Sequence, residues 1–235
     1  MDWPIALIVV AIVMSILSWY LNLPGVKGRI GEKAVARTLS RAAQKYQGVS
    51  YHDIMLGVGI DSAQIDNILI TQKCAYVLEV KNYRGRIYGS ETDCNWYQTI
   101  KYSNRIKGKR GRNYYKTHIE KNPFYNPVMQ NRTHVYKMIK HIPMIQRLPI
   151  INIVVFLNYA ELMSIKVESR NVHVINLKEL HRLIDTNELR RPFMLSPEDL
   201  LLLATDINNA NTRTKENMKQ HVARIRENKN RGNSK

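Results

Sequence analysis

Two apolar runs separated by a short polar break lie near the middle of the chain, in residues 64–85 (QIDNILITQKCAYVLEVKNYRG). The runs are rich in Ile, Leu, Val and Tyr, and the break at Gln72 and Lys73 predicts a hairpin between two half-buried strands. If the turn contains an even number of residues, Asp66 on the first strand lies opposite Glu79 on the second. Directly paired side chains of an antiparallel ladder have Cβ atoms about 5 Å apart. The pattern therefore predicts two carboxylates side by side.

Further periodic segments flank this hairpin. Apolar residues at helical spacing, Val35, Leu39, Ala42 and Tyr46, predict an amphipathic helix that begins near Gly28. The other predicted elements are a strand over 50–56, a helix over 126–141 with Asn126-Pro127 at its start, strands over 150–157 and 172–176, and helices over 177–184 and 196–207. Strands that alternate with helices in this way predict an α/β fold.

Residues 4–23 form an almost uninterrupted apolar run. About twenty residues at a helical rise of 1.5 Å cover the roughly 30 Å hydrocarbon core of a bilayer. Trp3, Trp19 and Tyr20 lie near the two ends of the run, where amphipathic rings prefer the membrane interface. The segment predicts a single transmembrane helix.

A cleaved signal peptide is the alternative for this segment, but no Lys or Arg precedes the run, and the run is long for that role. Basic residues follow it instead, at Lys27, Arg29, Lys33 and Arg37, whereas Asp2 precedes it. Under the positive-inside rule, the N-terminus is expected outside and the rest of the chain in the cytoplasm. We therefore expect a single-pass membrane protein.

The charge balance of the chain is strongly basic, since 36 Lys and Arg residues against 19 Asp and Glu residues give a formal net charge of +17. An excess of this size indicates a polyanionic partner, either nucleic acid or the anionic face of a membrane. Cys74 and Cys94 are the only cysteines, and their separation does not match a metal site. The composition favours a reducing compartment and predicts no disulfide framework.

Positive charge is concentrated in residues 101–116 (KYSNRIKGKRGRNYYK), which contain no acidic residue. No helical or strand period is visible there, and the pattern predicts a mobile basic loop that contacts phosphates and stacks on bases. The alternative is a solvated, disordered insertion. The predicted nucleic-acid-binding residues are Lys101, Arg105, Lys107, Lys109, Arg110, Arg112 and Lys116. A second basic segment, residues 213–235, predicts a charged helix that frays into disorder and offers a further polyanion contact.

Charged residues in the central hairpin indicate the candidate chemistry. Asp66 and Glu79 interrupt apolar runs, where an unpaired charge is costly to desolvate, and two facing carboxylates repel unless they share a proton or a cation. Lys81 lies two residues after Glu79 and projects to the same face of its strand. A carboxylate pair beside an ammonium is suited to hold Mg²⁺ and to meet a phosphate. The alternative is a solvated strand face whose surface ion pair contributes little.

Three polar residues on predicted helices could complete such a site. Glu32 lies on the apolar stripe of its helix, as a third ligand or a water-positioning group, although an acidic residue in a first turn also complements the helix dipole. Gln130 and His134 lie one turn apart on one helix face. They could orient a phosphate or the attacking water, or they could be ordinary polar residues at the edge of a packed helix.

An ordered set of short motifs runs through these segments: Gly31-Glu32-Lys33, His52-Asp53-Ile54, residues 65–70, residues 78–82, Trp96, Asn126-Pro127, Gln130 and His134. In this order they resemble the nuclease-related domain, a branch of the restriction-endonuclease-like PD-(D/E)xK superfamily. The resemblance covers roughly residues 28–157, and residues 158–235 have no counterpart in it. It implies a three-layer α/β core of order α-β-β-β-α-β with a mixed sheet and an N-terminal transmembrane helix. The remaining residues predict a small C-terminal extension of this core.

The resemblance also implies roles for the residues singled out above. It makes Asp66, Glu79 and the backbone carbonyl of Val80 ligands of Mg²⁺ or Mn²⁺, Lys81 the catalytic lysine, Glu32 the helix carboxylate, and Gln130 and His134 members of an accessory helix motif. Such a site cleaves phosphodiester bonds of nucleic acid.

The sequence thus predicts a membrane-anchored, divalent-metal-dependent nuclease that hydrolyses phosphodiester bonds, with DNA favoured over RNA. The expected domains are an anchor over 1–24, a nuclease domain over 25–160, a strand and helix extension over 161–210 and a basic tail over 211–235. Two alternatives stay open: a non-catalytic module that tethers DNA or RNA at the membrane, and a basic scaffold on anionic lipid with a vestigial site.

Overall fold

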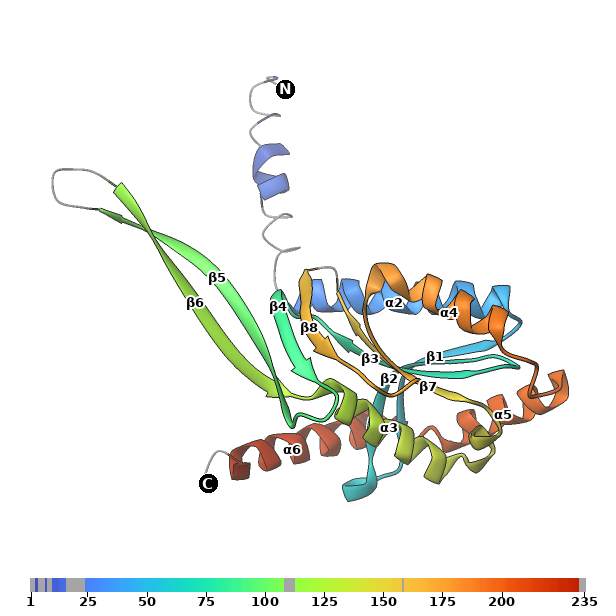
Figure 1. The fold of residues 1–235 in the computed structure, drawn as a ribbon. Coiled ribbons are helices and arrows are strands. Elements are labelled where there is room, and N and C mark those ends of the chain that lie inside the picture. Colours follow the sequence, from blue (N-terminus) through green and yellow to red (C-terminus); the bar gives the residue numbers. More distant parts are fainter. Residues whose placement is uncertain are drawn as a thin grey trace.

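The computed structural model describes residues 3, 7, 10–15, 24–107, 113–157 and 159–232 of the 235-residue chain. Two β-sheets form its framework, helices cover both faces of the larger one, and a long two-stranded ribbon extends away from the smaller one (Figure 1). The central hairpin of the sequence lies in the larger sheet.

The larger sheet contains five strands in the order β1-β2-β3-β7-β9. Their bounds are Val49–Leu56 (β1), Ala63–Ile70 (β2), Ala75–Lys81 (β3), Ile150–Phe156 (β7) and Val172–Asn176 (β9). The first three are antiparallel neighbours, whereas β3, β7 and β9 run parallel. With α2 (Pro24–Lys45) before β1 and α3 (Pro127–His141) before β7, the predicted mixed sheet and its order α-β-β-β-α-β are confirmed.

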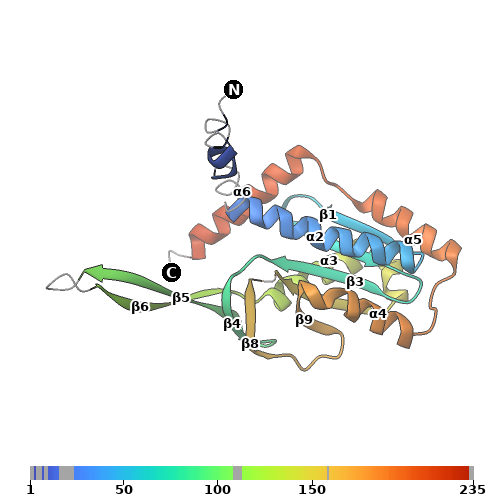
Figure 2. The same cartoon turned by 90° about the horizontal axis from the view of Figure 1, so that it is seen from above.

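Helices cover the larger sheet on both sides, which gives three layers (Figure 1), and the view from above shows α2 lying over one face (Figure 2). On one face lie α2 and α4 (Leu180–Arg190), and the predicted stripe of α2 is buried, since Val35 and Leu39 pack with Leu78 of β3. On the other face lie α3 and α5 (Pro197–Ala210). Burial of these apolar stripes from water holds the layers together.

Alternation along β3 decides which helix each candidate residue meets. Leu78 packs into the core under α2 and α4, whereas Val77 belongs to the core under α3 and α5. Because side chains two residues apart share a strand face, Glu79 and Lys81 continue the row of Val77. Both therefore point toward α3.

A second, smaller sheet has the strand order β6-β5-β4-β8. Its strands are Gly85–Ser90 (β4), Asn95–Lys107 (β5), Asn113–Tyr125 (β6) and Ala160–Lys166 (β8). A third apolar core joins it to the larger sheet, and in this core the rings of Trp96 and Phe156 stack with centroids 6.4 Å apart. The sequence predicted no second sheet.

The prediction of a mobile loop over residues 101–116 is wrong. β5 and β6 form a continuous antiparallel ladder up to the pair Lys107 and Asn113, and residues 108–112 between them lie outside the described part of the chain. Neither face of the outer half of this ribbon is buried, so polar and aromatic residues occupy both faces. Alternation of apolar and polar residues marks a strand in a sequence only where one face is apolar. The outer ribbon has no apolar face, so its sequence shows no such alternation.

The basic tail of the sequence forms helix α6 (Lys215–Gly232). It contacts the short 3₁₀ helix η1 (Gly59–Asp61), and His221 is buried with its Nδ1 2.9 Å from Oγ of Ser62. The charged helix predicted for residues 213–235 is therefore present, and its first half docks on the domain. Two further 3₁₀ turns, η3 (Pro143–Arg147) and η4 (Leu177–Glu179), connect α3 to β7 and β9 to α4.

Most of the predicted membrane span, residues 4–23, lies outside the described part of the chain. No helix within the described residues is both long and apolar enough to cross a bilayer. The anchor and the predicted topology stay predictions.

Candidate active site

The hairpin of β2 and β3 has the register that the sequence predicted. Asn67 pairs with Leu78 and Ile70 with Ala75, and the same register places Asp66 opposite Glu79. The ladder between the two strands ends at Asn67. The Asp66 carboxylate instead accepts a hydrogen bond from the backbone N–H of Val80, with Oδ2 2.9 Å from that nitrogen.

Glu79, Lys81, Gln130 and His134 form a compact cluster between β3 and α3. Lys81 Nζ donates to Oε1 of Glu79 at 2.7 Å and to Oε1 of Gln130 at 2.8 Å. His134 Nδ1 lies 3.4 Å from the other Glu79 oxygen, Oε2. The helix α3 is set in place by Asn126, whose side chain caps its first turn by accepting from the N–H of Val128 at 2.9 Å.

Burial controls the charge of this cluster. The Glu79 side chain is 4% exposed, and burial raises its pKa, while the Lys81 ammonium opposes that rise. Burial lowers the pKa of His134 to about 4, so the imidazole is neutral near pH 7 and forms no ion pair with Glu79. Oε2 of Glu79 and Nδ1 of His134 are both buried without a hydrogen-bond partner in the described part of the chain.

Asp66 adds a second perturbed carboxylate. Burial, and next the neighbouring Glu79 carboxylate, raise the pKa of Asp66 to about 6. A carboxylate whose pKa is raised by burial and by a neighbouring carboxylate is stabilised in its charged form when a cation joins the pair. The orphaned oxygen of Glu79 and the Asp66 carboxylate therefore fit a hard divalent cation, which prefers oxygen ligands and keeps several waters.

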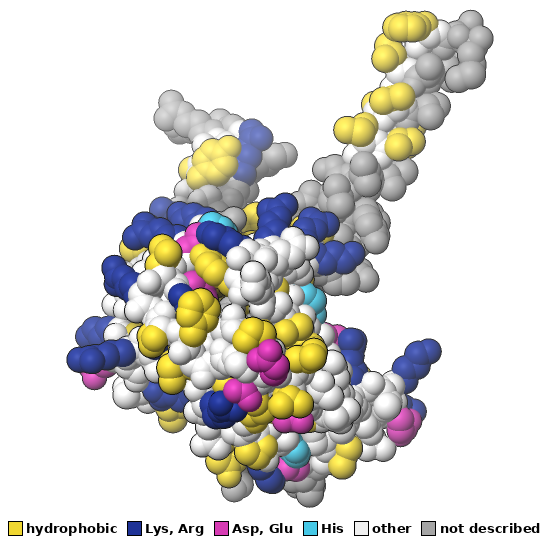
Figure 3. Space-filling view, turned by 90° about the vertical axis from the view of Figure 1, so that its right-hand side faces the viewer, with side chains coloured by type: hydrophobic (Ala, Val, Ile, Leu, Met, Phe, Trp, Pro, Cys, Tyr) yellow, Lys and Arg dark blue, Asp and Glu magenta, His cyan; other side chains and the backbone are white. Residues whose placement is uncertain are grey.

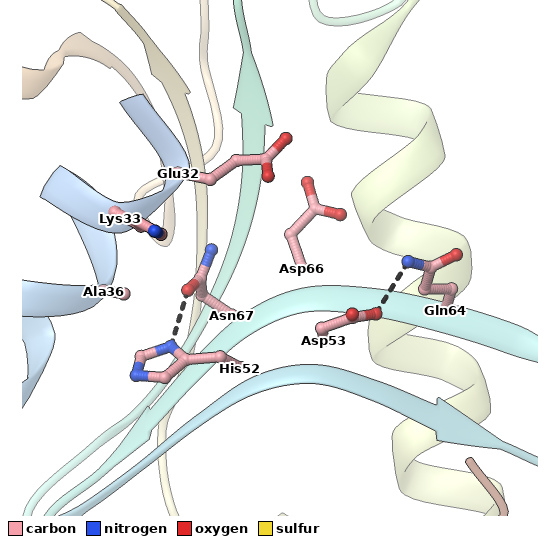
Figure 4. A pocket seen from close by; sticks show the side chains of 8 residues that line it. All are labelled: Glu32, Lys33, Ala36, His52, Asp53, Gln64, Asp66 and Asn67. Carbon is pink, nitrogen blue, oxygen red and sulfur yellow. Dashed lines mark hydrogen bonds between the residues drawn. The ribbon is translucent and has the colours of Figure 1, made fainter. Parts of the chain in front are cut away.

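Asp66 also lines a pocket of about 380 Å³ beside α2. In Figure 4 the Glu32 carboxylate from α2 and the Asp66 carboxylate from β2 point toward one another across this pocket. Asp66 thus lies between Glu32 on one side and the cluster around Glu79 on the other. Among the described residues, no three Asp, Glu, His or Cys side chains are close enough together to hold a metal ion by themselves.

The six side chains predicted for the site come from four elements that the fold brings together: Glu32 from α2, Asp66 from β2, Glu79 and Lys81 from β3, and Gln130 and His134 from α3. The prediction that the Val80 carbonyl is a ligand stays a prediction. The predicted nucleic-acid-binding residues are not in this cluster. Lys101, Arg105 and Lys116 are exposed on the ribbon, the side chain of Lys107 is not described, and Lys109, Arg110 and Arg112 lie outside the described residues.

Six further residues without a predicted role in the site line the pocket: Lys33, Ala36, His52, Asp53, Gln64 and Asn67. Asp53 has a φ of 53°, a backbone conformation rarely adopted by residues other than glycine, and it interrupts the ladder between β1 and β2. Its Oδ1 accepts from Nε2 of Gln64 at 2.8 Å. A charge inside a strand was the signal used to find Asp66, and the same signal could have found Asp53.

Known proteins share the segments that build this site. The nuclease-related domain matches residues 27–157, a range that contains all six predicted site residues. An uncharacterised protein of Bacillus anthracis is 31% identical over 203 residues, which are 86% of this chain and 84% of the relative. No solved structure matches the chain.

Proposed function

Because the chain belongs to the nuclease-related domain family, we propose that it hydrolyses phosphodiester bonds of nucleic acid with the help of a divalent metal ion. The observation that carries the proposal is the Glu79 carboxylate. It is almost fully buried, one of its oxygens binds the Lys81 ammonium, and the other has no hydrogen-bond partner among the described residues. A purely structural carboxylate is normally satisfied at both oxygens.

Asp66 and Glu79 are the proposed metal ligands, with the Val80 carbonyl as a third oxygen. Mg²⁺ or Mn²⁺ held there would lower the pKa of a bound water and stabilise charge that develops on the phosphate. Glu32 lies across the pocket from Asp66. At that place its carboxylate could accept a hydrogen bond from the attacking water and orient it.

Lys81 is the proposed partner of the scissile phosphate. Its ammonium is held by Glu79 and Gln130, which fixes the position of a charge that would otherwise move on a flexible stem. A fixed cation stabilises negative charge that increases on the phosphoryl oxygens in the transition state. Gln130 then acts as a positioning residue, because it holds Lys81 and not the substrate.

The strongly basic composition supports nucleic acid as the substrate, and DNA is the nucleic acid that we propose. The apolar run over residues 4–23 and the basic residues after it support a membrane-anchored enzyme whose catalytic domain faces the cytoplasm. Both statements belong to the proposal.

The test uses the full-length chain in mild detergent with end-labelled duplex DNA, single-stranded DNA and RNA, in EDTA, Mg²⁺ or Mn²⁺. We expect cleavage only with metal, and a rise in melting temperature when metal is added, since a ligand that binds only the native state stabilises it by about 2.7 kcal/mol at one hundred times its Kd. Lys81→Ala should lose cleavage and keep nucleic-acid binding.

A second candidate function is a non-catalytic module that holds nucleic acid at the membrane. It is favoured by the exposure of Lys101, Arg105 and Lys116 on a ribbon apart from the carboxylate cluster. This module predicts no cleavage and no metal-dependent rise in melting temperature. That pair of results would remove the nuclease proposal.

A further inference from the structure

The ribbon of β5 and β6 extends well beyond the sheet that anchors it. β4 pairs with β5 only from Tyr97 to Thr99, whereas β5 and β6 remain paired up to Lys107 and Asn113. The two-stranded part, from Ile100 outward, has eight residues on β5, which span about 26 Å at the rise of a strand. Two-stranded ribbons are marginally stable alone in water. Because this extension adds little to the stability of the core, a role in docking a partner explains it better.

The ladder gives the ribbon two distinct faces. Tyr102 stacks on His118 with ring centroids 5.4 Å apart, on the face that begins with the buried Trp96. On the opposite face Lys121 Nζ lies 4.0 Å from the ring centroid of Tyr97. We call the first the inner face, because its base packs into the third core.

The outward face consists of the odd-numbered residues of both strands, among them Tyr97, Lys101, Arg105, Tyr115, Ile119 and Lys121.

Charge and apolar surface are distributed unequally between these faces. The outward face carries Lys101, Arg105 and Lys121 and no acidic residue among its described positions. The inner face carries one Lys and one Glu, Lys116 and Glu120, so these charges cancel. On the outward face, Tyr115 is 71% and Ile119 is 70% exposed, so the cations of this face surround two exposed apolar side chains.

The exposed apolar side chains near α4 and α5 lack this charge pattern. Leu189, Phe193, Leu201 and Leu202 are exposed near α4 and α5. On that side of the molecule, apolar side chains are intermixed with charges of both signs (Figure 3). No single-sign field marks a polyanion site there.

We propose that the outward face of the ribbon docks into the major groove of B-form duplex DNA. That groove admits a two-stranded β-ribbon, and its walls are lined by phosphates that Lys101, Arg105 and Lys121 can reach. Tyr115 and Ile119 offer apolar contact to base edges such as the thymine methyl group. The A-form duplex of RNA has a deep, narrow major groove that excludes such a ribbon. The inference deepens the proposed function and rests on it only for nucleic acid as the ligand.

The experiment measures binding of the full-length chain in EDTA, where cleavage is suppressed, to fluorescent DNA duplex, the same single strand and the matching RNA duplex. We expect the DNA duplex to bind tightest. The triple variant Lys101→Gln, Arg105→Gln, Lys121→Gln should weaken duplex binding by about 100-fold at about 0.15 M salt and should flatten the slope of log K against log salt by about 2.7.

Arg105 and Lys116 provide a matched pair, since Arg105 pairs with Tyr115 and Lys116 with Asn104 on the neighbouring rung. Arg105→Gln and Lys116→Gln each remove one positive charge at almost the same distance along the ribbon, but from opposite faces. Arg105→Gln should weaken duplex binding about fivefold and lower the salt slope by about 0.9. Lys116→Gln should change the duplex affinity and the salt slope by less than half as much as Arg105→Gln does. Equal losses in the two variants would contradict a face-specific contact.

Competition identifies the groove. A ligand of the major groove should displace the protein from the duplex, whereas a ligand of the minor groove should not. Equal affinity for single-stranded DNA, or for the RNA duplex, would overturn groove docking. Because every arm is read without metal, loss of cleavage in a separate assay leaves this result unaffected, and the two proposals can fail independently.

Discussion

The candidate active site and the β5–β6 ribbon are built in opposite ways. The site lies between β3 and α3, where Glu79 is almost fully buried and Lys81 and His134 are mostly buried. The outer ribbon has no layer packed on either face, and Lys101, Arg105 and Tyr115 are exposed. The site gathers carboxylates whose pKa values burial raises, whereas the charged side chains described on the outward face of the ribbon are all cations.

This difference separates two tasks that the proposed nuclease must perform. Burial perturbs charge and holds groups in fixed positions, which are the requirements of chemistry. Exposure keeps cations free to exchange counterions for phosphates, which is the main source of affinity for nucleic acid. Substitutions in the site should therefore change turnover, and substitutions in the ribbon should change binding.

The largest effect is expected at Glu79. Glu79→Gln keeps the size of the side chain but removes the charge that a metal ion and Lys81 require, and we expect cleavage to fall by at least about 10³-fold. DNA binding in EDTA should stay unchanged. Glu161→Gln, an exposed Glu on β8, is the control. If Glu79→Gln lost DNA affinity to the same degree as cleavage, the site and the ribbon would not have separate roles.

Asp66 gives a test through stability and pH. Its pKa is raised to about 6 in the folded chain, against about 3.9 when unfolded. The native state therefore binds the proton more tightly, and this contribution to stability, present below about pH 4, is lost as pH rises through 6. Relative to the parent, metal-free Asp66→Asn should gain about 2.4 kcal/mol between pH 4 and pH 7.5, since the unfolded carboxyl is already partly protonated at pH 4.

Denaturant unfolding at the two pH values measures this difference. His134, whose pKa is lowered to about 4, acts in the opposite direction, since its contribution is lost as pH falls from about 6.5 to 4. His134 is present in both proteins, so most of its contribution cancels from the difference between them, although the Asp66 charge raises the pKa of His134 in the parent alone. A stability difference that is the same at both pH values would mean that Asp66 is not perturbed by burial and Glu79.

Shortening the ribbon should produce the next largest effect. Ile100 and Glu120 face each other on the ladder, and an Asn-Gly turn can replace residues 101–119 between them. The base should persist because Trp96 remains buried in the third core. We expect KM for duplex DNA to rise by about 100-fold, with kcat at saturation nearly unchanged. A fall in kcat with constant KM would assign the ribbon to the chemistry.

The smallest effect is expected at Gln130, which accepts a hydrogen bond from Lys81 Nζ. Gln130→Leu removes one of two fixed acceptors, and the ammonium then keeps only Glu79. We expect kcat to fall about tenfold, as for a lost hydrogen bond to a charged group, while KM stays constant. Gln130→Glu, which keeps an acceptor oxygen, should restore part of kcat. An unchanged kcat in Gln130→Leu would show that Glu79 alone positions Lys81.

The sequence determined the elements that carry the site. The apolar stripe of α2, the register of the β2–β3 hairpin and the start of α3 at Asn126-Pro127 were all predictable, and the structure confirms them. Each depends on local rules: the helical period, the even turn and the side-chain cap. Asp66, Glu79 and Lys81 were recognised because a charge inside an apolar strand is costly and therefore conspicuous.

Tertiary structure alone decided what these residues contact. Packing of α3 over β3 brings Gln130 to Lys81 and His134 to Glu79, across a sequence distance that no periodicity spans. The positive φ of Asp53 and the pairing of β5 with β6 could not be predicted from the sequence either. A local pattern reports only which face of an element is buried. Where no face is buried, as in the outer ribbon, long-range hydrogen bonding alone decides between strand and loop.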